Sequence, residues 1–197
     1  MSHLTAPAAR SSSIDGNRSR PSFRPWWKWL LTGLAFPPSG LIAHVVAGPV
    51  DSVSAAALNG AIAGAGIGAA QWALLRHRDV SRIWIAATAL GLGAGLAAGA
   101  ALVGYRTDIT SLAVMGAVSG LGVGIAQGAT SFGDSRRTLG WSLATSALFA
   151  LGWTITTAGG IDVSQQWAVF GAYGCMTLAF LQSMVVGSFV PAKTVES

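Results

Sequence analysis

Three glutamines are the residues of this chain whose type and spacing point most directly to a shared role. Gln71, Gln127 and Gln182 lie 56 and 55 residues apart, each inside a long apolar stretch. A primary amide is costly in hydrocarbon unless it is hydrogen-bonded. We therefore expect the three side chains to face the protein interior. There they would either tie helices together, which we favour, or form a polar ring that lines a narrow pathway or binding site.

Two further polar residues could take part in such a pathway. His44 could titrate or bond a backbone carbonyl, and Asn59 is a comparable polar candidate. His44 follows FPPSG at 36–40, where proline removes a backbone donor and clashes with the preceding turn, so a helix should kink or break there. Broken helices near the midplane are typical of transporter sites, although many membrane prolines are only structural kinks.

Composition excludes most catalytic and metal chemistry. The one cysteine, Cys175, allows no intrachain disulfide and no cysteine-based metal cluster. No apolar stretch carries an acidic residue, so none holds paired carboxylates for acid–base catalysis or for metal binding. We predict that the protein is not an enzyme and has no catalytic residue, cofactor or metal ion. Its basic residues lie in tails and short loops, which argues against nucleic acid as a partner.

Charged residues divide the chain into a long apolar region and two polar ends. Asp, Glu, Lys and Arg make up 10% of the 197 residues, against about 25% in a typical soluble domain. Residues 1–25 are predicted to be a disordered basic tail, 26–190 a transmembrane domain, and 191–197 a second short tail. Six stretches of the domain contain no charged residue: 29–48, 53–75, 83–104, 109–131, 139–159 and 166–189.

Each stretch is long enough for a helix to cross a bilayer core of roughly 30 Å. Because the stretches also lack the alternation of barrel strands, the fold predicted is an all-α membrane protein with six transmembrane helices. Eleven of the twelve Lys and Arg residues lie on the side of the two tails, and Arg106 lies on the other side. The positive-inside rule then places both termini in the cytoplasm, with the chain in the cytoplasmic membrane.

Tryptophans and aspartates mark the two ends of the predicted helices. Six tryptophans lie near the cytoplasmic ends, where an indole ring can rest at the headgroup level: Trp26, Trp27, Trp29, Trp72, Trp84 and Trp141. Asp51, Asp108 and Asp162 lie at the opposite ends, each followed closely by Ser or Thr. We predict that these aspartates cap helices, with an acidic ring that attracts cations as the alternative.

The sequence before each glutamine repeats. Three segments align without gaps: GAIAGAGIGAAQ at 60–71, GAVSGLGVGIAQ at 116–127 and GAYGCMTLAFLQ at 171–182. The repeating unit is a helical hairpin, present at 29–75, 83–131 and 139–189. Copies that share one orientation are related by an axis along the membrane normal, so we expect a pseudo-threefold bundle of three hairpins.

Small residues recur at every fourth position of these segments. Such a stripe, a glycine zipper, lets two helix backbones approach closely in lipid. We predict that it packs helices and binds no ligand. Its members are Gly60, Gly64, Gly68, Gly116, Gly120, Gly124, Gly171, Cys175 and Ala179.

The run GAGIGAAQWALLR at 64–76 has a GxxxGxxQWxxLR-like pattern, which shortens to GLGVGIAQG at 120–128. This pattern resembles that of uncharacterised bacterial multi-pass membrane proteins with repeated glycine-rich helices. The resemblance implies a bacterial membrane protein and brings no activity with it.

Two functions remain open. The first is a non-catalytic structural or accessory bundle, whose partners are the bilayer and either another membrane protein or further copies of the chain. The alternative is a small permease or channel for a small solute, lined by the glutamines, His44 and the PPSG break. A sealed interior would favour the bundle, and a continuous water path past these residues would favour transport.

Overall fold

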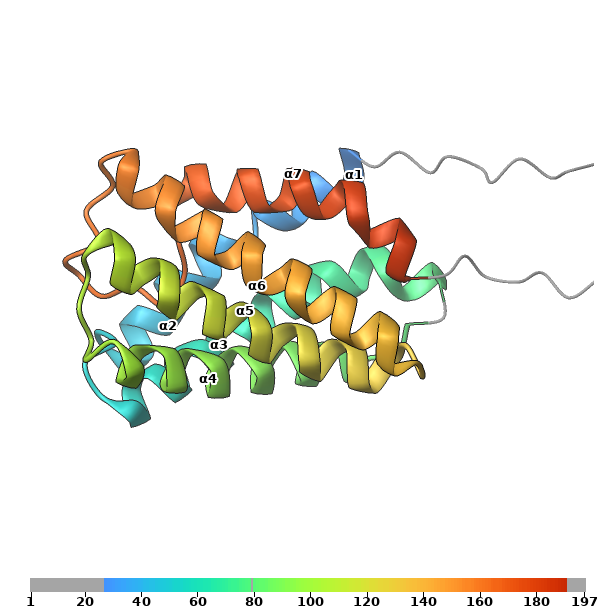
Figure 1. Ribbon diagram of the computed structural model, residues 1–197, viewed down its shortest axis with the longest axis horizontal. Helices are drawn as coiled ribbons and strands as arrows, with labels where there is room; N and C mark the ends of the chain where they lie inside the picture. The colour runs from blue at the N-terminus through green and yellow to red at the C-terminus, as the bar shows by residue number, and fades with distance from the viewer. Residues whose placement is uncertain (1–26, 79, 191–197) are drawn as a thin grey trace, which may run out of the picture.

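The computed structural model describes residues 27–78 and 80–190, and most of these residues are helical (Figure 1). The two predicted tails, 1–25 and 191–197, lie outside the described residues. The elements in chain order are α1 (Trp27–Gly33), α2 (Phe36–Ala47), α3 (Val53–Leu75), the 3₁₀ helix η1 (Arg76–Arg78), α4 (Ile83–Leu102), α5 (Ile109–Ser131), α6 (Ser135–Ala158) and α7 (Ala172–Phe189).

Six helical spans in the described residues are long and apolar enough to cross a membrane, with α1 and α2 together making the first. This confirms the predicted all-α fold with six transmembrane helices. Large apolar side chains lie on the outer surface of these helices: Val45 is 75% exposed and Leu90 is 71% exposed. Since water would disfavour so much exposed apolar surface, the spans imply a lipid bilayer as their surroundings.

The helices follow one another around the bundle in chain order. α3 packs on α4, α4 on α5 and α5 on α6, while α7 lies against both α6 and α1. α1 begins and α7 ends at the same end of the molecule, which we call the terminal end (Figure 1). The opposite end holds the loops 48–52, 103–108 and 159–171, and we call it the loop end.

The first span is broken beside its two prolines, as predicted. α1 ends at Gly33, a turn follows, and α2 starts at Phe36. Pro37 therefore lies in the first turn of α2, where its missing N–H would have had no partner within the helix. The chain restarts a helix at the proline pair because proline is favourable in a first turn and unfavourable in a helix interior.

The predicted bounds of the last two spans are wrong. α6 starts at Ser135, four residues before the charge-free stretch 139–159, because Asp134 caps it by accepting the backbone N–H of Arg136 at 2.9 Å. α7 starts at Ala172 and not at 166, and the preceding residues Ala168–Phe170 form a buried, non-helical segment. Spanning helices and buried loops both lack charged residues. The charge-free stretch 166–189 is therefore longer than the sixth helix.

Of the three aspartates predicted to cap helices, one does so. Asp108 is the N-cap of α5 and accepts the backbone N–H three residues later at 3.0 Å. α3 is capped by Ser52, which takes the place predicted for Asp51. Asp162 lies within the loop 159–171, where its Oδ1 accepts the Ser164 hydroxyl at 2.6 Å. The cap predictions for Asp51 and Asp162 are therefore wrong: Ser52 provides the cap of α3, and α7 begins at Ala172, ten residues after Asp162.

Small residues lie where the helix backbones approach most closely. A Cβ atom added to Gly60 would lie 2.6 Å from the carbonyl oxygen of Leu92, and one added to Gly64 would lie 2.6 Å from that of Thr88. Gly120 faces the carbonyl oxygen of Thr145 in the same way, at 2.5 Å. The remaining glycines of these two stripe segments, Gly68, Gly116 and Gly124, likewise meet α4 or α6.

The third segment of the stripe is less regular. Gly171 is the N-cap of α7 and lies outside the helix. Cys175 and Ala179 are buried in α7 and face α1, where a Cβ atom added to Gly33 would lie 3.0 Å from that of Ala179 and 3.2 Å from the Cys175 carbonyl oxygen. Cys175 and Ala179 therefore lie at the contact between the first and last helices, whereas a Cβ atom added to Gly171 would meet Ile161 and Thr156.

Candidate functional site

Each of the three glutamines accepts a hydrogen bond from a tryptophan indole. The three bonds run from Trp84 Nε1 to Gln71 Oε1 (3.1 Å), from Trp141 Nε1 to Gln127 Oε1 (2.9 Å) and from Trp29 Nε1 to Gln182 Oε1 (3.4 Å). They join α4 to α3, α6 to α5 and α1 to α7. We call these six residues the glutamine–tryptophan layer. All six side chains are buried in the interior of the bundle.

Helix geometry explains why these pairs meet. Trp84 lies in the first turn of α4, and Gln71 lies in the last two turns of α3, the antiparallel helix on which α4 packs. Trp141 lies in the second turn of α6, and Gln127 lies in the last two turns of α5. A buried indole N–H needs an acceptor, and a buried amide oxygen needs a donor, so each residue meets the other's requirement.

Two of the glutamines are also bonded to each other. Gln127 Nε2 donates to Gln71 Oε1 at 3.1 Å and to Thr88 Oγ1 at 2.8 Å. The Thr88 hydroxyl in turn donates to the carbonyl oxygen of Trp84 at 2.7 Å. A continuous polar network therefore crosses α3, α4, α5 and α6 inside the bundle. Amides, indoles and hydroxyls do not ionise near neutral pH, so this network can hold helices together but supplies no acid, base or strong nucleophile.

Aromatic rings cover the layer on its terminal side. The ring of Phe132, just after α5, lies 6.1 Å from that of Trp141, and the ring of Phe189, at the end of α7, lies 5.5 Å from it. Trp84 and Trp141 lie 6.4 Å apart between their ring centres. These contacts surround the amides with apolar surface and strengthen their hydrogen bonds by excluding water.

The headgroup position predicted for the tryptophans is wrong for three of them. Trp29, Trp84 and Trp141 are 5, 0 and 0% exposed. Trp72 is half-buried, donates to the Val80 carbonyl oxygen at 3.1 Å, and lies under the guanidinium of Arg82. Trp26 and the side chain of Trp27 lie outside the described residues. The rule that tryptophan favours the interface does not distinguish a lipid-facing indole from an inward-facing one.

His44 and Asn59 lie apart from the layer, toward the loop end. Asn59 is twelve residues before Gln71 in α3, which is about 18 Å along a helix. Its Nδ2 donates to the carbonyl oxygens of Gly48 and Ala55, at 2.9 and 3.0 Å, so it holds the turn between α2 and α3. The ring of His44 lies tilted against that of Trp167, with their centres 4.3 Å apart. The five predicted polar residues therefore do not form one site.

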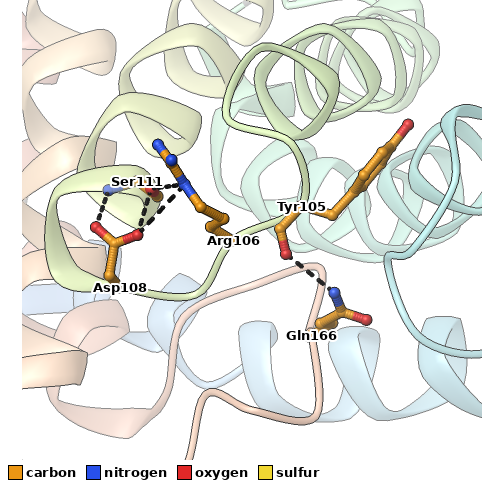
Figure 2. A network of polar contacts seen from close by, with 5 residues as sticks. All are labelled: Tyr105, Arg106, Asp108, Ser111 and Gln166. Atoms are coloured by element: carbon orange, nitrogen blue, oxygen red, sulfur yellow. Dashed lines mark hydrogen bonds and ion pairs between the residues drawn. The ribbon is translucent and has the colours of Figure 1, made fainter.

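The loop 159–171 closes the loop end of the bundle. Gln166 Nε2 donates to the Tyr105 carbonyl oxygen at 3.0 Å (Figure 2), and the Gln166 carbonyl oxygen accepts the Val50 N–H at 3.0 Å. Phe170 enters the core, where its ring stacks on that of Phe36 at 5.2 Å and meets that of Phe149 edge-on at 5.3 Å. The loop is thus tied to both neighbouring loops and anchored in the core.

A second polar cluster lies beside this contact (Figure 2). Arg106 forms an ion pair with Asp108 at 3.7 Å and donates to the Ser111 hydroxyl at 3.2 Å. Hydrogen bonds from the Ser111 hydroxyl and backbone N–H lower the pKa of Asp108, and Arg106 adds to this effect. The one basic residue of the loop end is therefore already paired, and the predicted cation-attracting acidic ring is partly neutralised.

A cavity of about 420 Å³ lies between α2, α6 and the loop 159–171. Its lining includes Pro37 and Gly40 from the break in the first span and Trp153 from α6. None of the three glutamines lines it, and neither does His44. The cavity therefore belongs to the loop-end half of the bundle and is separate from the layer.

The tryptophan partners of the glutamines were not predicted from the sequence. Trp29, Trp84 and Trp141 are 55 and 57 residues apart, nearly the spacing of the glutamines themselves. That shared period was the signal that could have paired them. No protein-family model, curated protein or solved structure matches this chain.

Proposed function

We propose that this protein is a non-catalytic structural or accessory bundle of the bacterial cytoplasmic membrane, with both termini in the cytoplasm. The observation that carries the proposal is the glutamine–tryptophan layer. Its amide oxygens and indole N–H groups bond to one another across helices. A polar group arranged for a solute would instead present unfilled donors and acceptors to an open path. The eleven-to-one distribution of basic residues supports the orientation.

The proposal includes three hairpin repeats, 29–75, 83–131 and 139–189, around a pseudo-threefold axis. The same tryptophan–glutamine bond occurs at each of three joints, and the joint between α1 and α7 connects the last hairpin to the first. The stripe supports the same arrangement, because its small residues meet α4, α6 and α1 in turn. The irregular position of Gly171 is the main departure from the repeat.

The two ends of the bundle support a sealed interior. Aromatic rings cover the layer toward the terminal end, and the anchored loop with Phe170 closes the loop end. A solute that crossed along the bundle axis would have to separate buried hydrogen bonds, each of which costs free energy to break in an apolar environment. The protein partners of such a bundle would be another membrane protein or further copies of this chain.

The alternative function is a small permease or channel for a small solute. The observation that favours it is the cavity beside the PPSG break, because a broken helix next to a cavity is a common arrangement in transporters. In this reading the cavity would have to connect to the glutamines when the protein changes conformation.

A flux assay tests the two functions against each other. Full-length protein is reconstituted into liposomes, and the entry of water, glycerol and urea is followed by light scattering. The structural role predicts rates equal to those of empty liposomes, with Gln127→Leu lowering stability. A flux well above that of empty liposomes, abolished by Gln127→Leu in a protein of unchanged stability, would support the channel and overturn the structural role.

A further inference from the structure

The sixth span is the shortest of the six. It has 18 residues, against 20 to 26 for the other spans, so α7 is about 27 Å long at 1.5 Å per residue. The missing length is at the loop end, because α7 begins only at Ala172. There, residues of α2, of α6 and of the loop 159–171 face one another. The cavity of about 420 Å³ lies between them.

The lining of this cavity is apolar inside and polar at its edge. Trp153 and Phe170 form its inner wall and are each 2% exposed. Asp162 and Gln165 lie at its edge and are exposed. Its volume falls within the roughly 300–1,000 Å³ typical of small-molecule sites. A molecule that fits it therefore has an apolar body and a polar end.

The surroundings of the cavity identify the source of such a molecule. Leu41 lines the cavity and is 54% exposed, and its neighbours Ile42 and Val45 are exposed on the same helix. In a membrane these side chains contact lipid chains, while the loop with Asp162 lies toward the headgroups. A lipid that enters from the adjoining leaflet would thus have its chain beside Trp153 and its headgroup beside Asp162.

Charge at the loop end restricts the headgroup. The three loops there contain Asp51, Asp108 and Asp162 but one basic residue, Arg106, which is paired with Asp108. Hydrogen bonds from the Ser164 hydroxyl and N–H lower the pKa of Asp162, so its carboxylate is charged at neutral pH. A net negative loop end repels an anionic headgroup and attracts an ammonium group.

We propose that this cavity binds one acyl chain of a phospholipid with an ammonium headgroup, of the phosphatidylethanolamine class, with the ammonium beside Asp162. The proposal uses the membrane-spanning arrangement of the proposed function but neither its accessory role nor its orientation. It assigns a role to the short α7 and to the loop 159–171 that helix packing alone does not require.

Photolabelling tests the proposal. Full-length protein is reconstituted into vesicles of equal parts phosphatidylethanolamine and phosphatidylglycerol that contain one of two probes. The probes are a phosphatidylethanolamine and a phosphatidylglycerol that carry the same diazirine-bearing acyl chain. Labelled residues are mapped by peptide mass spectrometry. Leu143, which is 57% exposed on α6, is the reference for a residue that any surrounding lipid reaches.

We expect both probes to label Leu143 equally and the ethanolamine probe to label Trp153 and Phe170 as well. The glycerol probe should label these two buried residues about two- to fivefold less, which is the range expected for one partly exposed ion pair. If Leu143 is labelled and Trp153 and Phe170 are not, no chain enters and the proposal is overturned. If Leu143 itself is unlabelled, the membrane-spanning arrangement fails instead. Equal labelling of the buried pair by both probes would overturn the headgroup assignment.

Two cavity-filling variants locate the bound chain, and a third variant tests the headgroup contact. Val163→Trp and Leu41→Trp fill the cavity from the loop and from the lipid side, and each should abolish the labelling of Trp153 and Phe170. Val53→Trp is the matched control, an exposed position at the same end of the bundle, and should change nothing. Labelling that persists in both filled variants would overturn the proposal. Asp162→Asn should keep the labelling but remove the preference between probes, and a preference unchanged in this variant would refute the role of the carboxylate.

Discussion

Trp141 and Gln127 form the shortest of the three tryptophan–glutamine hydrogen bonds, at 2.9 Å, and Gln127 is also the residue that extends the network to Gln71. One amide thereby connects α6, α5 and α3, and through Thr88 it reaches α4 as well. Its Oε1 accepts one bond and its Nε2 donates two. Four of the six spans depend on the orientation of this single side chain.

Replacing Gln127 with Leu should therefore lower stability markedly. The side chains have similar volume, but the substitution removes three hydrogen bonds and leaves the buried Trp141 N–H without its acceptor. We expect a loss of about 1–3 kcal/mol, measured as thermal unfolding of the purified protein in detergent. The control is Ser119→Ala, since Ser119 donates only to the Met115 carbonyl oxygen of its own helix. Equal effects of the two variants would contradict the importance of the layer.

The tryptophan donors should differ in their contributions. Trp141→Phe removes a bond of 2.9 Å and Trp29→Phe one of 3.4 Å, which is at the long limit for a hydrogen bond. We expect Trp141→Phe to be the more destabilising by about 0.5–1 kcal/mol. The measurement is the same unfolding assay on both variants. A larger effect of Trp29→Phe would show that the contact between α1 and α7 is the stronger one.

Glycine substitutions should separate packed from open positions. A Cβ atom at Gly64 would lie 2.6 Å from the Thr88 carbonyl oxygen, whereas one at Gly187 would meet nothing within 4 Å. Gly64→Ala should cost about 1–3 kcal/mol by forcing α3 and α4 apart. Gly187→Ala should be neutral or stabilise by up to about 1 kcal/mol, since alanine is the better helix former. Equal tolerance of the two would contradict the close backbone contact.

Thiol labelling tests the orientation. In a Cys175→Ala background, cysteine is placed at Ser164 in the loop 159–171 or at Ser135 at the start of α6, both of which are exposed. A membrane-impermeant maleimide should label intact bacterial cells at position 164 and should reach position 135 only after permeabilisation. Reporter fusions at Ser12 and Thr194 should both report the cytoplasm. The reverse labelling pattern would invert the proposed topology.

Acid should weaken the start of α5. The pKa of Asp108 lies below its ordinary value of 3.8 in the folded protein, chiefly because the Ser111 hydroxyl donates to it. A lowered folded pKa means that this contribution is present above pH 3.8 and is lost as the pH falls through the folded value. Ser111→Ala should reduce the loss of stability on acidification over that window, followed by thermal unfolding at successive pH values. An unchanged pH profile would argue against the Ser111 contact.

The six spans could be predicted from charge alone, because hydrocarbon excludes ionised side chains so strongly that each loop is marked by them. The break before Pro37 could be predicted because proline has no backbone N–H to donate within a helix. The sequence could not distinguish a spanning helix from a buried loop, or an indole in the protein interior from one in the headgroup region. Residues 166–171 avoid charge as a helix would, yet Phe170 is buried in a loop. The indole of Trp84 is as suited to the headgroup region as to the interior, and only its partner Gln71 decides between them.

The joint between Trp29 and Gln182 has a consequence for biosynthesis. The partners at the other two joints are 13 and 14 residues apart, so each pair can form as soon as two adjacent spans have entered the membrane. Trp29 must wait for a glutamine 153 residues later in the chain. Until the last span has been synthesised, the indole N–H of Trp29 lacks the acceptor that it has in the complete protein. A chain that lacks α7 therefore leaves two helix faces without their partner, that of α1 and that of α6, and within the described part of the chain only at α1 does it also leave a buried hydrogen bond unformed.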